Sequence, residues 1–347
     1  MLEILLEEKK RHPAAEARDL CKLLYQSEFG AGHMAMDAEA GLARLRAECA
    51  ACGAGEDEPF TDVGGGLVRL HLRALPALKL RLETVNGLFA RACAPRGSVA
   101  GLEAKLELLR ANAARLGLNG ETLEAELAAW RAAGYPALSH SRAYRDLYHP
   151  AYRLVPASAR RFLALFQAID ALLQRQGRAR IAIDGNSGAG KSTLGALLVG
   201  VYGGNLYHMD DFFLPPQRKT RERLAEPGGN VDRERFFAEV LSRLGTAFSY
   251  RPWRCHEGAL AAPVAVEPQA VEIVEGVYSL HPDLRNAYDL RVFLAIPPKA
   301  QAERIRARSG EAMLERFVRE WIPLENAYFS HLGVRACCQL AFDGAAQ

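Results

Sequence analysis

Apolar residues recur at helical spacing through most of the first 150 residues. They lie three and four positions apart in EARDLCKLLYQ, EAGLARLRAEC, GLEAKLELLRANAARLG and ETLEAELAAWRAAG, which places them on one face of a helix. The alternating run LVRLHLRAL is typical of a strand, and CGAGEDEPFTDVGGG predicts a loop because it is rich in glycine and acidic residues. The pattern therefore predicts a mainly helical N-terminal domain over residues 1–150.

The pattern changes after this region. ARRFLALFQAIDALLQRQG has the spacing of an amphipathic helix that ends at Gly177. Short apolar runs then alternate with helical segments, in the order RIAID, GKSTLGALLVG, NLYHM, DRERFFAEVLSRL, AVEIVEG, LRVFLAI and AERIRAR. Alternation of this kind predicts an α/β domain with a parallel sheet covered by helices on both faces. We place this second domain at residues 151–347, with the boundary between about residues 145 and 160.

Composition narrows the class of protein. The 347 residues are 49% apolar and 24% charged, and the net charge of +3 is spread without long runs of one sign. This argues against nucleic-acid and membrane partners. No apolar stretch approaches the roughly 20 residues that span a bilayer, and the start, MLEILLEEKKRHP, has acids where a signal peptide is basic. We expect a cytoplasmic protein whose partner is a small molecule, and an oligomer remains open.

The seven cysteines form no dense framework and favour reduced thiols. Cys49 and Cys52 form a CxxC, but no second pair follows at zinc spacing, so a metal site is the minor alternative.

The stretch IAIDGNSGAGKSTL matches the phosphate-binding pattern G-x-x-x-x-G-K-[ST]. Glycines let successive backbone N–H groups point at phosphate oxygens, and the helix that follows adds its positive end. In this pattern the lysine reaches the β- and γ-phosphates, and the serine hydroxyl binds Mg²⁺. The residues expected to hold ATP are Gly185, Asn186, Ser187, Gly188, Ala189, Gly190, Lys191, Ser192 and Thr193. The fold predicted for residues 151–347 is thus the three-layer fold of P-loop NTPases.

A P-loop alone does not define a reaction. The chain has no N-K-x-D motif for guanine recognition, which argues against a GTPase. A motor or transporter ATPase is expected to have an apolar strand that ends in Asp followed by a catalytic Glu, whereas the candidate strand here reads VEIVEGVYS. This pattern is closer to that of small-molecule kinases.

The ordered motifs resemble those of the uridine kinase and phosphoribulokinase group of P-loop kinases. They are the P-loop, HMDDFF, NVDRERF, IVEG and RIRAR, and they span roughly residues 178 to 345. RLAEPGGNVD and WIPLE are also found in bacterial uridine-kinase-like proteins that have a similar N-terminal half. The resemblance implies an ATP- and Mg²⁺-dependent kinase that phosphorylates a hydroxyl of a nucleoside or a related small metabolite.

The resemblance also assigns catalytic roles. Asp210 aligns with the acid that accepts the proton of the attacking hydroxyl, while Asp211 fills a variable position and is interpreted as a turn residue. Glu275 would join Ser192 at Mg²⁺. Arg304 and Arg308 lie four apart, hence on one helix face, and could neutralise the transferring phosphate as lid arginines do, or be solvated surface residues.

The acceptor is less well defined. Asp232 aligns with an acid that binds sugar hydroxyls, but it also precedes a helix and fits an N-cap equally well. Trp253 and His256 lie where the group has an aromatic and a histidine that contact the base. Their neighbours Arg254 and Cys255 depart from the family pattern, which places uridine itself in question.

Two polar clusters in the N-terminal half have no assigned role. FGAGHM contains His33, and SHSRAYRDLYHPAYR contains His140, Arg142, Tyr144, Tyr148 and His149. The second is either part of a pocket or a packed linker helix, and we favour the linker. A different hypothesis for the whole chain is a nucleotide-dependent sensor or ATPase switch whose N-terminal half binds a ligand or a partner.

Overall fold

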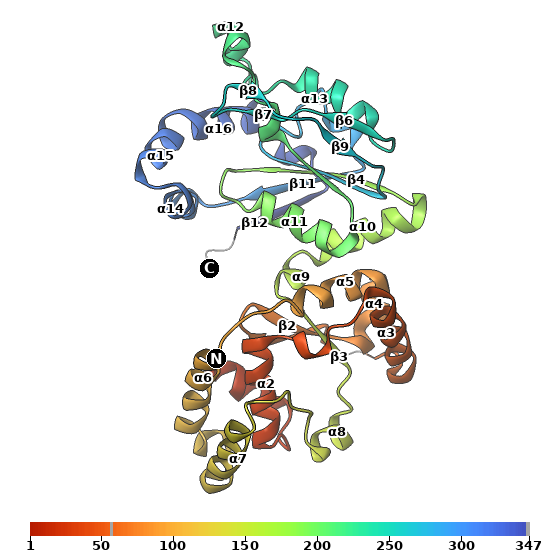
Figure 1. The fold of residues 1–347 in the computed structure, drawn as a ribbon, viewed down its shortest axis with the longest axis vertical. Coiled ribbons are helices and arrows are strands. Elements are labelled where there is room, and N and C mark those ends of the chain that lie inside the picture. The colour runs from red at the N-terminus through yellow and green to blue at the C-terminus, as the bar shows by residue number, and fades with distance from the viewer. Residues whose placement is uncertain (56–57, 345–347) are drawn as a thin grey trace. The chain divides into compact units, whose positions relative to one another are not determined.

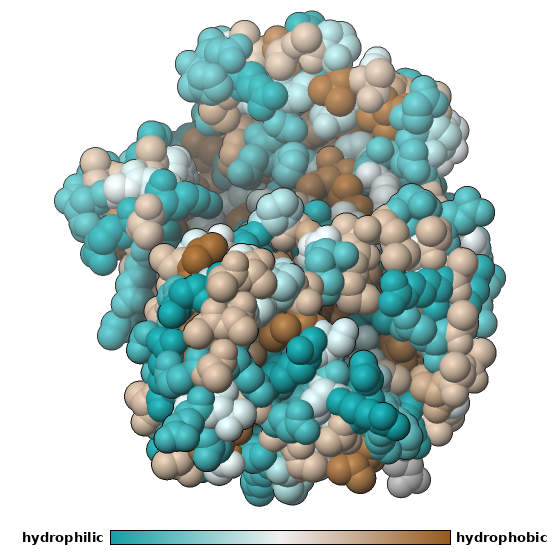
Figure 2. Space-filling view, turned by 60° about the horizontal axis from the view of Figure 1, so that its bottom comes forward, coloured by the Kyte–Doolittle hydropathy of each residue, from teal (hydrophilic) through white to brown (hydrophobic). Residues whose placement is uncertain are grey.

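The computed structural model describes residues 1–55 and 58–344. The chain forms two compact units, residues 1–167 and 168–347, and the division falls inside helix α10 (Leu163–Gln176). Each unit is described separately. No helix in the described ranges combines the length and apolar character that crossing a membrane requires. Hydrophilic and weakly apolar residues cover most of the face seen in Figure 2.

The N-terminal unit combines helices with a small antiparallel sheet of order β1-β2-β3 (Figure 1). Its α-helices are α1 (Leu2–Arg11), α2 (Ala17–Phe29), α3 (Ala38–Cys52), α4 (Leu75–Leu78), α5 (Leu82–Ala92), α6 (Val99–Ala111), α7 (Gly120–Ala132), α8 (Arg142–Tyr148) and α9 (Ser158–Arg161). Its strands are β1 (Phe60–Gly64), β2 (Leu67–His71) and β3 (Tyr152–Pro156). Its 3-10 helices are η1 (Gly32–Met34), η2 (Leu72–Ala74) and η3 (Ala114–Leu116).

Some of these helices are stabilised by side-chain N-caps, and some by packing in a shared apolar cluster. Asp37, Ser98, Asn119 and Ser141 each accept a backbone N–H at the start of α3, α6, α7 and α8, as N-caps do. Leucines of α1, α2, α6 and α7 pack into one buried cluster together with Trp130.

The structure differs from the sequence prediction at two places in this unit. The predicted glycine-rich loop contains β1, because Phe60 and Val63 are buried and the strand pairs with β2. Glu56 and Asp57 of that loop lie outside the described residues. The domain boundary expected near residue 150 lies at Gln167, because β3 pairs antiparallel with β2 along Leu67–His71 and so belongs to the first unit.

The C-terminal unit is built on a five-stranded parallel sheet of order β12-β11-β4-β10-β5. Its strands are β5 (Asn205–His208), β4 (Ala179–Gly185), β10 (Val271–Glu275), β11 (Leu290–Ala295) and β12 (Leu340–Asp343). Figure 1 shows helices on both sides, with α11 (Lys191–Tyr202) on one and α13 (Arg233–Glu239) with α16 (Ile322–His331) on the other. The parallel sheet predicted from strand and helix alternation is confirmed. Every residue of β10 is buried, as expected for a central strand covered on both faces.

Shorter elements connect this framework. The remaining helices are α12 (Arg221–Ala225), α14 (Pro298–Ser309), α15 (Glu311–Arg316) and the π-helical turn η8 (Phe317–Trp321). The 3-10 turns are η4 (Met209–Phe212), η5 (Pro216–Arg218), η6 (Leu241–Arg243), η7 (Arg285–Ala287) and η9 (Arg335–Cys337). Two small hairpins pair β6 (Phe248–Tyr250) with β9 (Val264–Val266) and β7 (Trp253–Arg254) with β8 (Ala259–Leu260).

Candidate active site

The predicted P-loop connects central strand β4 to helix α11. A Cβ atom at Gly185 would lie 2.0 Å from the carbonyl oxygen of Leu294, so only glycine fits there. Gly188 and Gly190 have φ of 78° and 96°, values that favour glycine. The Asn186 N–H donates to Leu294 O at 3.1 Å and ties the loop to the neighbouring strand. The loop is therefore fixed in a shape that other residues would disrupt.

Lys191 starts α11 and folds back over this loop. Its Nζ donates to Gly185 O at 2.8 Å and to Asn186 O at 3.1 Å, and the side chain is buried. The ammonium lies close to the start of a helix, where backbone N–H groups also point outward. This arrangement is suited to anionic phosphate.

A cavity of about 680 Å³ opens beside the loop and collects most of the predicted site residues. It is lined by Ser187, Gly188, Gly190, Lys191, Ser192, Thr193, Asp210, Phe213, Asn230, Glu275, Gly276, Val277, Tyr278, Arg304, Arg308, Phe317, Trp321 and Glu325. The residues predicted for phosphate, metal, base and lid thus meet at one place, although they span more than 100 positions of the chain.

Glu275 and Ser192 form a hydrogen-bonded pair at the carboxyl end of the sheet. Ser192 Oγ donates to Glu275 Oε1 at 3.0 Å. His208 is paired with Glu275 across β5 and β10, and its Nδ1 contacts the same oxygen. This hydrogen bond raises the pKa of His208. His208 begins the HMDDFF motif but was not predicted as a site residue, because it reaches Glu275 only through strand register.

The Ser192–Glu275 pair suits Mg²⁺ by the chemistry of its donors. Mg²⁺ prefers oxygen ligands and is usually bound by one or two protein groups together with substrate phosphates. Within residues 1–55 and 58–344, no group of three or more His, Cys, Asp or Glu side chains is arranged to hold a metal ion. The Ser192 hydroxyl and the Glu275 carboxylate fit a Mg²⁺ site that is completed by the phosphates of a bound nucleotide. Cys49 and Cys52 belong to no group of three such side chains among the described residues.

The two adjacent aspartates have different surroundings. Asp210 lies in η4 directly after β5 and lines the cavity. Burial raises its pKa, and the nearby positive charge of Lys191 opposes this shift. Asp211 does not line the cavity, and its carboxylate lies 3.5 Å from Arg254 Nη1. Only Asp210 is placed where it can meet a molecule bound beside the loop.

Asp184, the residue before Gly185, anchors the start of the P-loop through hydrogen bonds. It is fully buried and accepts hydrogen bonds from Leu280 N at 3.0 Å and Tyr328 Oη at 2.8 Å. Burial raises its pKa to about 6. Asp184 was not among the predicted site residues, but its hydrogen bond with Tyr328 connects β4 to α16 directly before the P-loop.

The lid arginines come from α14. Arg304 Nη1 donates to Gly188 O at 3.2 Å, and the Arg308 guanidinium lies 5.9 Å from the centre of the Phe317 ring. Arg306 instead pairs with Glu311 at 2.6 Å, as expected from its position on another face of the helix. The prediction that Arg304 and Arg308 share a face is therefore confirmed, while their role in transfer stays a prediction.

Glu325 is a site residue that the sequence analysis missed. It lies in α16, is 3% exposed, and accepts hydrogen bonds from both the backbone N–H of Ser187, at 3.1 Å, and the Ser187 hydroxyl. Burial raises its pKa. It lies in WIPLEN, a stretch that was noted only for resemblance. No local signal separates this buried acid from the many exposed ones.

The three predicted acceptor residues do not line this cavity. Asp232 caps α13 by accepting the Arg235 N–H at 3.2 Å and also pairs with Arg218, in agreement with the N-cap alternative. Trp253 lies in the β7–β8 hairpin, and His256 is exposed and lies 3.1 Å from Glu257. Their contacts with an acceptor stay predictions, and the structure instead offers Phe213, Asn230 and Tyr278 beside Asp210 in the lining.

Comparisons with known proteins give only distant likenesses. No protein-family model and no curated protein sequence matches the chain. A possible uridine kinase from Bacillus stearothermophilus is 18% identical with a TM-score of 0.39, over 52% of this chain and 100% of that chain. A putative fructose transport system kinase from Silicibacter sp. TM1040 is 23% identical with a TM-score of 0.43, over 52% and 97%. TT1252 from Thermus thermophilus is 18% identical with a TM-score of 0.30, over 49% and 90%. These values are too low to assign a family, so function has to be argued from the site.

Proposed function

We propose that the C-terminal unit is an ATP- and Mg²⁺-dependent kinase that transfers the γ-phosphate to a hydroxyl of a nucleoside-like or other small metabolite. The observation that carries this proposal is the single cavity in which the P-loop, the Ser192–Glu275 pair and Asp210 meet. Phosphoryl transfer needs positioning and charge stabilisation more than covalent chemistry, and these groups supply both.

Each residue has a defined task in this proposal. Lys191 and the loop N–H groups bind the phosphates, and Ser192 with Glu275 holds Mg²⁺, which neutralises phosphate charge when bound. Asp210 orients the acceptor hydroxyl and takes its proton as the new oxygen–phosphorus bond forms and the bond to the departing ADP oxygen breaks. Arg304 and Arg308 offset the charge on the transferring group.

The cavity also limits the acceptor. Its volume of about 680 Å³ lies within the range of small-molecule sites. Aromatic residues Phe213, Tyr278, Phe317 and Trp321 and the amide of Asn230 line it beside the charged groups. Such a lining suits a compact acceptor that has an apolar or aromatic face and hydroxyl groups.

A metabolite screen tests the proposal. We expect a cell extract incubated with the full chain, ATP and Mg²⁺ to gain a product heavier by one phosphate, detected by mass spectrometry. Lys191→Ala should yield none of it, because the buried ammonium that faces the phosphates is lost. If no extract or hydroxyl-acceptor panel gives a product, while ATP changes ligand binding by residues 1–150, the sensor hypothesis replaces the kinase.

The pH profile gives a second prediction. Asp210 acts as a base only when ionised, and burial raises its pKa. The rate at saturating ATP should therefore fall on the acid side at a higher pH than an ordinary aspartate would give. Initial rates measured across pH in constant ionic strength would check this. A rate that stays flat down to the usual range of aspartate would contradict the role of Asp210 as base.

A further inference from the structure

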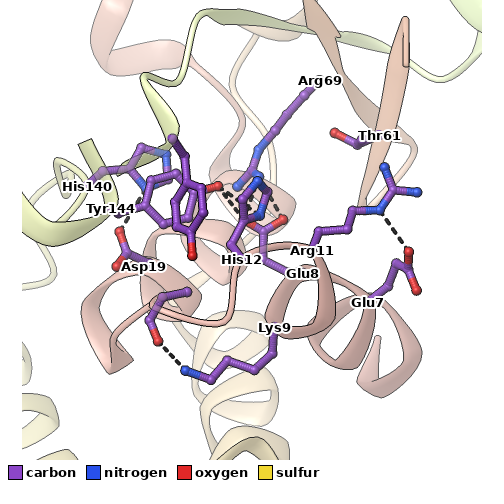
Figure 3. Close-up of polar contacts among 12 residues, drawn as sticks. Glu7, Glu8, Lys9, Arg11, His12, Asp19, Thr61, Arg69, His140 and Tyr144 are labelled. Carbon is purple, nitrogen blue, oxygen red and sulfur yellow. Dashed lines mark hydrogen bonds and ion pairs between the residues drawn. The ribbon is translucent and has the colours of Figure 1, made fainter. Parts of the chain in front are cut away.

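The N-terminal unit contains a buried ion pair that its apolar core does not require. Arg69 of β2 and Glu8 of α1 are 2% and 5% exposed. Arg69 Nη1 donates to both carboxylate oxygens of Glu8 at 2.9 Å, and Tyr144 Oη donates to Oε1 at 2.8 Å (Figure 3). Desolvation makes a buried pair costly compared with apolar residues of similar size. A polar cluster of this kind is therefore more typical of a binding site than of a simple core.

A second set of contacts holds this pair in place. His140 Nδ1 lies 2.8 Å from Asp19 Oδ1, and His140 Nε2 lies 2.8 Å from Tyr152 Oη. Burial lowers the pKa of His140, so the ring is neutral at pH 7. Its Nδ1–H then donates to the Asp19 carboxylate, which leaves Nε2 to accept the Tyr152 proton. The Tyr152 ring in turn lies 4.7 Å from the Arg69 guanidinium.

The polar cluster around Arg69 and Glu8 includes hydrogen-bond donors that have no acceptor within the described ranges. Arg69 Nε is buried and has no hydrogen-bond partner among the described residues. A buried N–H without a partner costs free energy unless water or a ligand satisfies it. Tyr148 Oη accepts the Ala14 N–H at 2.9 Å, which leaves its own proton to donate. Tyr144 Oη gives its proton to Glu8, so it accepts from His12 Nδ1–H at 3.2 Å, and Nε2 of this neutral tautomer is an acceptor.

These three side chains line one cavity of about 190 Å³. Among the described residues that line it, Glu58 is the one carboxylate, and it pairs with Arg11 at the rim with 55% of its side chain exposed. The cavity therefore offers donors and few acceptors. Its volume equals that of about six water molecules, which suits a small ligand or one end of a larger one.

Acidic residues lie on the other side of the Arg11–Glu58 pair. A depression of about 260 Å³ is lined there by Glu3, Glu7 and Asp62. These carboxylates would repel a ligand with several negative groups. The distribution of charge thus favours a ligand with one anionic group, which would enter the donor-rich cavity.

We propose that this cavity is a binding site for a small ligand that carries a single carboxylate or phosphate group, bound by Arg69 Nε and Tyr148 Oη. The proposal is independent of the kinase proposal, because none of these residues belongs to the P-loop unit. It assigns a ligand site to the N-terminal unit, in which the kinase proposal names no residue.

Isothermal titration calorimetry on the full chain tests the site. Inorganic phosphate and propionate are titrated separately in Tris chloride, with Lys191→Ala as background to weaken phosphate binding at the P-loop. We expect saturable binding of one equivalent of at least one probe. Phosphate alone would assign a phosphorylated ligand, and propionate alone a carboxylate. Binding of neither probe at millimolar concentration overturns the proposal.

Variants locate the binding. Tyr148→Phe should weaken the probe at least tenfold, because one of the two donors is lost at a partly exposed position. Arg142→Gln is the matched control, since this exposed arginine on α8 does not line the cavity and should bind as the parent does. Hydrogen exchange with the probe bound should show protection at residues 8–12 and 144–152. Equal binding by all variants, or protection confined to other segments, would overturn the assignment.

Discussion

Replacing Asp210 by Asn is expected to lower turnover by about 10²–10⁴-fold, the range that general-base catalysis contributes. Asparagine keeps the shape of the side chain but cannot take a proton from the acceptor hydroxyl. ATP affinity should remain nearly unchanged, because Lys191 and the loop N–H groups, which are intact, face the phosphates. Turnover is measured as ADP release with the acceptor found in the metabolite screen, and ATP affinity by calorimetry.

Asp211→Asn is the matched control for this substitution. It changes the neighbouring carboxylate, which contacts Arg254 and lies outside the cavity lining. Its turnover should stay within a few-fold of the parent. Full turnover in Asp210→Asn, or equal losses in both variants, would contradict the assignment of Asp210 as the base.

The P-loop and its surroundings were predictable because their signals are local. The spacing from Gly185 to Ser192 reports a backbone shape directly. Asp210 and Glu275 were assigned through the resemblance of HMDDFF and IVEG to family motifs, and the structure places them directly after β5 and at the end of β10. Both lie beside the loop because the carboxyl ends of neighbouring parallel strands meet at one edge of the sheet.

Glu325 and Asp184 were missed for the opposite reason. Glu325 meets Ser187 across 138 positions of the chain, and Asp184 meets Tyr328 across 144. Both contacts depend on how α16 returns to the sheet, which short-range periodicity does not encode. Acidic residues are usually solvated, so their types alone gave no reason to select these two.

The N-terminal unit shows the same limit. Periodicity located the helices that become α2, α3, α6 and α7, but β1 lies in a stretch whose glycines and acids indicated a loop. The histidine- and tyrosine-rich stretch was interpreted as a packed linker helix in preference to a pocket. His140 and Tyr144 are indeed buried with partners, yet Tyr144, Tyr148 and His149 also line the 190 Å³ cavity. Whether this stretch is a packed linker or part of a pocket depends on Glu8, Asp19 and Arg69, which lie in α1, α2 and β2.

Replacing Glu8 by Ala is expected to destabilise the N-terminal unit by about 3–5 kcal/mol, the usual cost of leaving one partner of a buried pair without its counter-ion. Burial alone would raise the pKa of Glu8, but the positive charge of Arg69 and the hydrogen bonds with His12 and Arg69 together outweigh it and lower the pKa well below its usual range. The carboxylate is thus ionised in the folded state, and its loss leaves the Arg69 guanidinium buried with Gln26 as its remaining side-chain hydrogen-bond acceptor among the described residues.

Hydrogen exchange of the full chain measures this effect unit by unit, since a chain with two compact units need not unfold in one step. Peptides from α1, α2 and β2 should exchange through a lower opening free energy in Glu8→Ala, while peptides from β4 and β10 should not change. Asp146→Ala is the control, because its pair with Arg142 is exposed, at 65% and 89%, and such pairs contribute about 0–1 kcal/mol. Glu8→Met with Arg69→Met should recover much of the loss by removing both charges. A Glu8→Ala chain as stable as the Asp146→Ala chain would show that Arg69 finds another counter-ion, and that the buried pair does not hold the unit together.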